Sequence, residues 1–225
     1  MIHPMVRRAR TIIAGYVHHI THYGAGGQDV LTNRDDYRTY LDCLESLSTK
    51  HGLSIWAYCL LPDHVRLVAV PSDAGALAAA MRDTHAAYAS YANWRGLTSG
   101  RVWKSRFSSC VVEDMFVWSA VRLVESLPAR LGMVKRAEKY TWSSAAPHCG
   151  LRQDPVLTSS FPPPGVVEDW PGWLAGAESE SALEKRLLLY TRTGHPFGSK
   201  AFVEELEHQT GRILRPQKRG PKPRS

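Results

Sequence analysis

Two β-strand patterns lie next to each other in this sequence, with only a short turn between them. Leu53–Leu60 is an aromatic and β-branched run, and His64–Val70 reads as a second strand. Pro62-Asp63 between them has the composition of a turn. The fold is therefore expected to be built around two consecutive strands that are joined tightly.

Helical patterns flank this strand pair. Asn33 or Asp35 is expected to cap a helix that runs to about His51, and Gly52 is expected to end it. An alanine-rich helix is predicted over roughly Gly75–Trp94. One helix is thus expected before the first strand of the pair, and another after the second strand.

Two further strands complete the pattern. Tyr16–Thr21 alternates and is rich in β-forming residues, and Arg101–Val112 is predicted to be a fourth strand. Glu113–Leu127 is predicted to be a helix that Pro128 stops. The order β-α-β-β-α-β is that of a ferredoxin-like fold, so the predicted class is α+β.

The character of the sequence changes after about Gly150. Phe161–Gly165 contains three prolines and is predicted to be a linker. Two helices are expected at Glu178–Tyr190 and Ser199–Thr210, with Ser199 capping the second. We therefore expect a main domain at 1–150, a linker and helical extension at 151–211, and a basic disordered tail at 212–225.

Composition restricts the class of protein. A chain of 225 residues with 44% hydrophobic residues can bury one full core. No apolar run approaches the roughly 20 residues that span a bilayer, and no secretory signal is visible, so no membrane partner is expected. The four cysteines lack paired spacing, which indicates reduced thiols in a cytoplasmic protein.

The positive charge indicates an acidic partner. The net charge is +7 and the pI is about 9.4. Part of the charge is in the segment from Arg212 to Ser225, which has six basic residues, three prolines and no acid. Such a tail is suited to neutralising phosphates, although a purely solubilising disordered end is the alternative.

One short motif resembles a metal site with one residue changed. In Leu61-Pro62-Asp63-His64-Val65-Arg66, a His-x-His pair on a strand would place two imidazoles on one face. Here the second position is Arg66, a permanent cation that repels a metal ion. Arg66 is expected either to pair with an acid such as Asp63 or to hold a phosphate directly.

Several ordered motifs together resemble the REP-associated tyrosine transposases, which are relatives of the single-tyrosine HUH transposases. They are His19-Ile20-Thr21 with Gly24, Trp56–Val65, Val102–Phe107, Leu123–Val134, Tyr140–Ala145, and Thr191-Arg192-Thr193-Gly194 through the tail. The resemblance implies that 1–150 is an HUH transposase-like DNA-binding domain. It also implies that two histidines and a polar helix residue hold Mg²⁺ or Mn²⁺ while a tyrosine attacks single-stranded DNA.

Most of the implied catalytic groups are missing from this chain. The first family histidine matches His64, but the second falls on Arg66. The tyrosine falls on Leu123 and the helix ligand on Leu127, which the matching Pro128, Arg130 and Gly132 follow. We therefore expect no intact catalytic residue, only a remnant metal ligand at His64, and no cofactor.

Other side chains are candidates for a replacement nucleophile, for a metal ligand or for a DNA contact. No tyrosine occurs between Tyr91 and Tyr140, so no shifted alignment restores the nucleophile. His18, His19 and His22 are expected at core and turn positions. Lys104 and Arg106 are predicted to alternate on a strand with Trp103 and Phe107, which suits a phosphate-tracking groove.

Three functions remain open at this stage. The first is a transposase-family protein that binds single-stranded or hairpin DNA without cleaving it, as a monomer or a dimer. The second is an active metal-dependent transposase that uses a non-standard tyrosine, and the third is a structural or interaction domain. For the first function, the expected DNA contacts are Arg66, Lys104, Arg106, Arg130, Arg215, Lys218, Arg219, Lys222 and Arg224.

Overall fold

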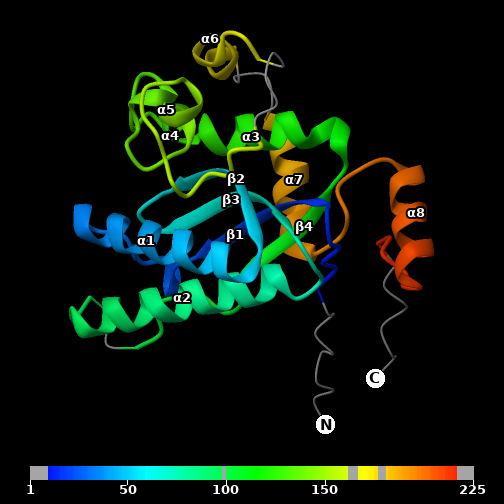
Figure 1. Ribbon diagram of the computed structural model, residues 1–225, viewed down its shortest axis with the longest axis horizontal. Coiled ribbons are helices and arrows are strands. Elements are labelled where there is room, and N and C mark those ends of the chain that lie inside the picture. The colour runs from blue at the N-terminus through cyan, green and yellow to red at the C-terminus, as the bar shows by residue number, and fades with distance from the viewer. Residues whose placement is uncertain (1–9, 98–99, 162–166, 177–180, 217–225) are drawn as a thin grey trace, which may run out of the picture.

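A four-stranded antiparallel sheet forms the centre of the molecule in the computed structural model, which describes residues 10–97, 100–161, 167–176 and 181–216 (Figure 1). Its strands are β1 (Val17–Tyr23), β2 (Leu53–Leu60), β3 (His64–Pro71) and β4 (Ser108–Val112). They lie in the order β2-β3-β1-β4, and every neighbouring pair is antiparallel. The α+β class and the ferredoxin-like order are confirmed.

Helices cover both faces of the sheet. Helices α1 (Arg34–His51) and α2 (Ala76–Trp94) pack on one face, and α3 (Val117–Glu125) and α7 (Ser181–Thr193) pack on the other (Figure 1). The shorter described elements are η1 (Ala25–Gly27), η2 (Asp114–Phe116), α4 (Leu127–Arg130), η3 (Ala137–Lys139), α5 (Ala145–His148), α6 (Trp170–Ala175) and α8 (Lys200–Thr210). The core therefore has two apolar layers, one on each face.

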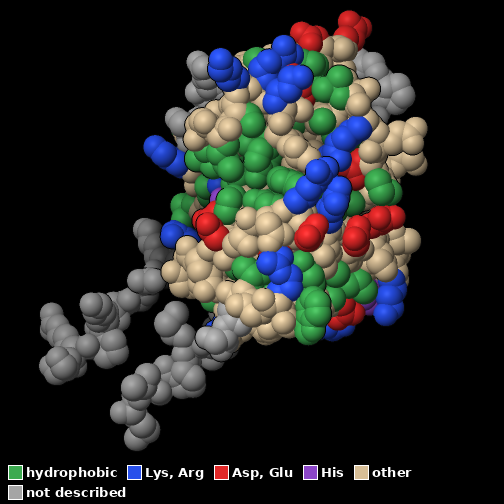
Figure 2. All heavy atoms as spheres, turned by 90° about the vertical axis from the view of Figure 1, so that its left-hand side faces the viewer, with side chains coloured by type: hydrophobic (Ala, Val, Ile, Leu, Met, Phe, Trp, Pro, Cys, Tyr) green, Lys and Arg blue, Asp and Glu red, His purple; other side chains and the backbone are tan. Residues whose placement is uncertain are grey.

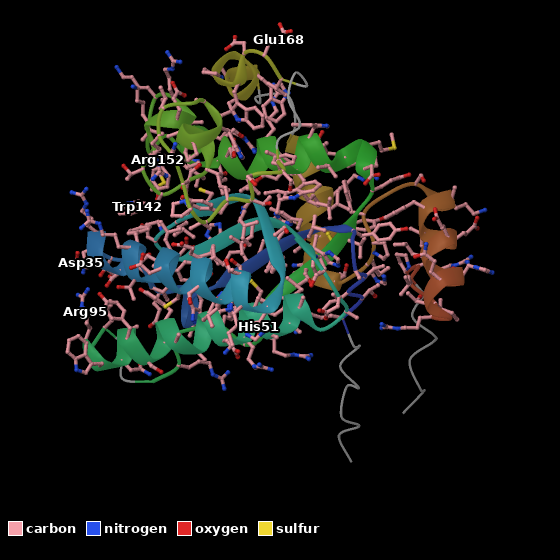
Figure 3. The ribbon with its side chains drawn as sticks, viewed as in Figure 1. Asp35, His51, Arg95, Trp142, Arg152 and Glu168 are labelled. Atoms are coloured by element: carbon pink, nitrogen blue, oxygen red, sulfur yellow. The ribbon has the colours of Figure 1, made fainter. Side chains whose placement is uncertain are left out.

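The ends of α1 follow the predicted capping chemistry. Asn33 accepts hydrogen bonds from the backbone of Asp35 and Asp36, and Asp36 completes the capping box. Gly52 ends the helix with a left-handed φ of 69°, which favours glycine. Arg95, just beyond α2, pairs with Asp36 and so joins the neighbouring ends of the two helices (Figure 3).

Alternation along β3 explains why His64 and Arg66 share a face. Val65 and Leu67 point into the apolar layer under α1 and α2. Val68 joins the opposite layer, under α3 and α7. Because strand side chains alternate, His64 and Arg66 lie on the same side as Val68.

The predicted fourth strand is too long at its start. It begins at Ser108, and residues 101–107 instead form an irregular segment in which Ser105 has a φ of 105°. The indole of Trp103 is buried and donates a 3.1 Å hydrogen bond to the carbonyl of His85. The segment pairs with the end of β1 only through an isolated antiparallel bridge between Trp103 and Gly24, so Lys104 and Arg106 do not lie on a strand.

The predicted helix after β4 is also divided. It begins with the 3-10 turn η2, α3 ends at Glu125, and α4 begins at Leu127. Pro128 lies in the first turn of α4, where a residue without a backbone N–H is tolerated. Pro128 therefore starts a new helical turn rather than stopping the old one.

The C-terminal helices lie against the same sheet. Helix α7 packs beside β4 and β1, and α8 packs its Phe202 and Leu206 against Val111 (Figure 1). Residues 162–165 of the predicted linker and 178–180 of the predicted helix lie outside the described residues. The proposed division of the chain at residue 150 stays a prediction. Across the described ranges, no helix is long and apolar enough to cross a membrane.

Candidate functional site

His64 begins β3 and is held by neighbours on both sides. Its Nδ1 lies 2.7 Å from Oδ1 of Asp63, and its ring stacks on Tyr23 with centroids 4.8 Å apart. Burial, and then the positive charge of Arg66, lower the pKa of His64. The neutral imidazole therefore has one nitrogen on Asp63 and one available to Arg66.

Arg66 belongs to an ion-paired network. Its Nε donates to Nε2 of His64 at 3.3 Å, and its Nη1 donates to Oε1 of Glu184 at 3.0 Å. Arg130 donates to the other oxygen of Glu184. We call this arrangement the Arg66–Glu184–Arg130 network. The acid that pairs with Arg66 is thus Glu184 on α7, whereas Asp63 contacts His64.

The network lies below the surface. The Arg66 side chain is 8% exposed and that of Glu184 is 13% exposed. Burial alone would raise the pKa of Glu184, but hydrogen bonds from Arg130 and Arg66 outweigh it and lower that pKa. Glu184 is therefore ionised at neutral pH and joins two cations that would otherwise repel each other.

Leu123 and Leu127 are core residues. Both are almost fully buried, and both belong to the apolar layer that holds α3 against β2 and β3. Within the described ranges, no group of three or more His, Cys, Asp or Glu side chains is arranged to hold a metal ion. A guanidinium at one ligand position and leucine at another do not fit a divalent cation.

A cationic cavity opens beside the network. It has a volume of about 630 Å³ and lies between the end of β1, residues 104–108 and α7. Its basic side chains are Lys104, Arg106, Lys185 and Arg192, and no acid is among the described residues that line it. Figure 2 shows one face of the molecule, on which Lys and Arg side chains lie among Asp and Glu side chains around a hydrophobic area. The cavity is therefore a strong local attractor for anions.

An exposed aromatic ring and several hydroxyl groups complete the cavity wall. Tyr23 is 38% exposed and lines the cavity while its ring stacks on His64. Thr21 also lines the cavity, and it is the register partner of Arg66 on the adjacent strand. The cavity therefore adjoins the Arg66–Glu184–Arg130 network through these two residues of β1.

Buried histidines contact the residues that line the cationic cavity. Nε2 of His22 contacts the Ser105 carbonyl at 2.9 Å, and its Nδ1 contacts Nδ1 of His85 at 3.0 Å. Burial lowers the pKa of His22 to about 4, so the ring is neutral at pH 7. His18 and His19 are also buried, as expected of core positions.

The remaining sequence-predicted contacts are scattered. Arg215 pairs with Glu207 beside α8, away from the cavity, and Arg130 reaches the site only through Glu184. Lys218, Arg219, Lys222 and Arg224 lie outside the described residues. Glu184, Lys185 and Tyr23 could not be predicted from the sequence, because no local motif marks them.

The other tyrosines near the sheet are engaged in the core. The hydroxyl of Tyr140 donates to the Leu60 carbonyl at 2.8 Å, and that of Tyr88 donates to the Val30 carbonyl. Burial raises the pKa of both phenols. Neither tyrosine lines the cationic cavity.

Comparison with known proteins identifies the fold. No family model and no curated protein matches the chain. The solved structure of a REP-associated tyrosine transposase bound to a REP hairpin has a TM-score of 0.55 and 18% identity. That match covers 66% of this chain and 89% of the transposase. A Deinococcus radiodurans protein assigned as a transposase is also similar (TM-score 0.34, 19% identity), with 51% of this chain and 92% of that one covered. The resemblance indicated by the motifs is confirmed at the level of the fold.

Proposed function

We propose that this chain, which shares its fold with a REP-associated tyrosine transposase, binds single-stranded or hairpin DNA without cleaving it. The cationic cavity is the observation that carries the proposal. Four basic side chains line it, and no acid is among the described lining residues. The solved REP-associated tyrosine transposase of similar fold is bound to a REP hairpin. The phosphate backbone of DNA is a polyanion that such a surface attracts.

The shape of the cavity favours a single strand. A volume of about 630 Å³ is large enough for a short piece of unpaired strand. An exposed ring such as Tyr23 offers a stacking surface to a base, while Lys104 and Arg106 meet the phosphates. Cations interleaved with an aromatic ring are typical of single-strand binding.

The proposed loss of cleavage follows from the chemistry of the site. At the four positions that the resemblance marks, only His64 has a metal-ligating side chain. Leu123 supplies no nucleophile, and the guanidinium of Arg66 is ion-paired with Glu184. A metal-dependent attack on a phosphodiester requires a nucleophile and a metal together.

Equilibrium binding of a labelled hairpin with a single-stranded 5′ extension tests the proposal. The dissociation constant would be measured from low to moderate salt, beside a blunt duplex of matched length. We expect tighter binding to the hairpin and an affinity that falls steeply with salt. An affinity that does not respond to salt, or no binding at low salt, would favour a structural or protein-interaction role instead.

A further inference from the structure

Glu184 places a carboxylate between two guanidinium groups. One oxygen of Glu184 accepts from Arg66 at 3.0 Å, and the other accepts from Arg130. Two arginines that share one oxyanion are a common way of holding a phosphate. The two basic residues come from the sheet and from α4, and the acid comes from α7.

Glu184 lies on α7, the helix that forms one wall of the cationic cavity. Lys185, the next residue of α7, lines the cavity, and so does Thr21, the strand partner of Arg66. The Glu184 side chain retains 13% exposure, so the carboxylate lies near the surface and not at the centre of the core. A bound strand in the cavity would bring its phosphates close to this position.

We propose that the Arg66–Arg130 pair is a second phosphate-binding site for DNA and that Glu184 occupies it in the free protein. This inference rests on the proposed function and adds a binding site to it. DNA would displace the Glu184 carboxylate, and a backbone phosphate would take its place between the two guanidiniums. In free protein Glu184 therefore acts as an internal phosphate mimic that weakens DNA binding.

The competition has a direct physical cause. A carboxylate held by two charge-assisted hydrogen bonds has to be removed before a phosphate can enter, which reduces the apparent affinity. The exchange replaces one anion by another, so neither guanidinium is left buried and unpaired. A phosphate that displaces Glu184 contacts two cations that Glu184 neutralises in the free protein. The bound DNA thereby gains one more phosphate contact than the cavity alone provides.

Substitution of Glu184 tests the site. We expect Glu184→Gln to bind the extended hairpin about tenfold more tightly than the wild type at low salt. The slope of log affinity against log salt should stay close to that of the wild type, because DNA contacts the same number of phosphates in both proteins once it has displaced the Glu184 carboxylate. Glu204→Gln is the matched control, because it removes the same charge from an exposed position on α8. That control should change neither quantity appreciably.

A second substitution separates the proposed site from a general charge effect. In the Glu184→Gln background, Arg66→Met should remove the gain in affinity and make the salt slope shallower by about 0.7 to 0.9, because one phosphate contact is lost. Thermal unfolding shows which variants are folded. Where Glu184→Gln is not folded, Glu184→Ala tests the same prediction, because it also removes the carboxylate. An unchanged affinity in folded Glu184→Gln would overturn the second site. A gain that persists after Arg66→Met would overturn it as well, while wild-type binding to the hairpin would leave the proposed function standing.

Discussion

The guanidinium of Arg66 lies 3.0 Å from the carboxylate of Glu184, although 118 positions separate the two residues in the sequence. This contact ties the third strand of the sheet to α7. At the position where the family resemblance implies a metal ligand, the chain therefore has an internal ion pair. The pair explains how Arg66 can be buried without a metal or an external anion.

The cavity cations should determine DNA affinity. Replacing Lys104 and Arg106 with Gln removes two positive charges from the cavity wall. We expect the salt slope for hairpin binding to become shallower by about 1.4 to 1.8, with weaker binding at low salt. Lys50→Gln is the control, since Lys50 is exposed at the end of α1, the helix on the other face of the sheet. An equal loss per charge removed in the two variants would show that only net charge matters.

Tyr23 should contribute through stacking and not through its hydroxyl group. We expect Tyr23→Ala to weaken binding to the single-stranded extension by about 1–3 kcal/mol, because stacking of one base on an aromatic ring has this magnitude. Tyr23→Phe keeps the ring and should bind nearly as well as the wild type. Fluorescence anisotropy with a labelled extension measures both. Equal weakening in both variants would assign the effect to the hydroxyl.

Glu125 should matter for stability without touching the cavity. Its buried carboxylate contacts Ser144, Nδ1 of His148 at 2.6 Å and Nε1 of Trp170 at 2.7 Å. We expect Glu125→Ala to lower the free energy of unfolding by about 3–5 kcal/mol, because buried polar partners are left without an acceptor. Urea denaturation measures this. Glu168→Gln, at the upper edge of Figure 3, changes an exposed acid and should stay within about 0.5 kcal/mol of the wild type.

Stability should fall in mild acid because several histidines are buried in the neutral form. Burial lowers the pKa of His18 to about 4 and that of His19 to about 3, against 6.5 in the unfolded chain. Below pH 6.5 the unfolded chain binds protons that the folded chain does not, so stability decreases as the pH falls toward 4. Each such histidine adds up to about 1.4 kcal/mol per pH unit. Urea unfolding at pH 7, 6 and 5 measures the trend, and a flat profile would contradict the buried neutral state.

The sequence was sufficient for the sheet and the first two helices because local signals agree there with the packing. The capping box at Asn33, the turn at Pro62-Asp63 and the alternation of β3 each have a local cause. The segment before β4 was predicted wrongly, because the buried indole of Trp103 overrides the strand propensity of its neighbours. Tertiary packing of this kind leaves no periodic pattern to detect.

The candidate site was only partly predictable for a related reason. His64 and Arg66 share a motif, so their common face followed from alternation. Glu184 and Lys185 come from a helix more than a hundred residues away, and their place depends on how α7 packs beside β4. Leu123 and Leu127 have helical spacing, and both are buried in the core.

A combined binding and cleavage assay most directly tests the central claim, which is that the protein binds DNA without cleaving it. The wild-type protein would be incubated with an end-labelled hairpin and Mn²⁺, then divided between a native gel and a denaturing gel. We expect a salt-sensitive shift on the native gel and free, uncut DNA on the denaturing gel. A covalent protein–DNA adduct that survives denaturation would contradict the account, and its loss in Tyr23→Phe would identify the nucleophile.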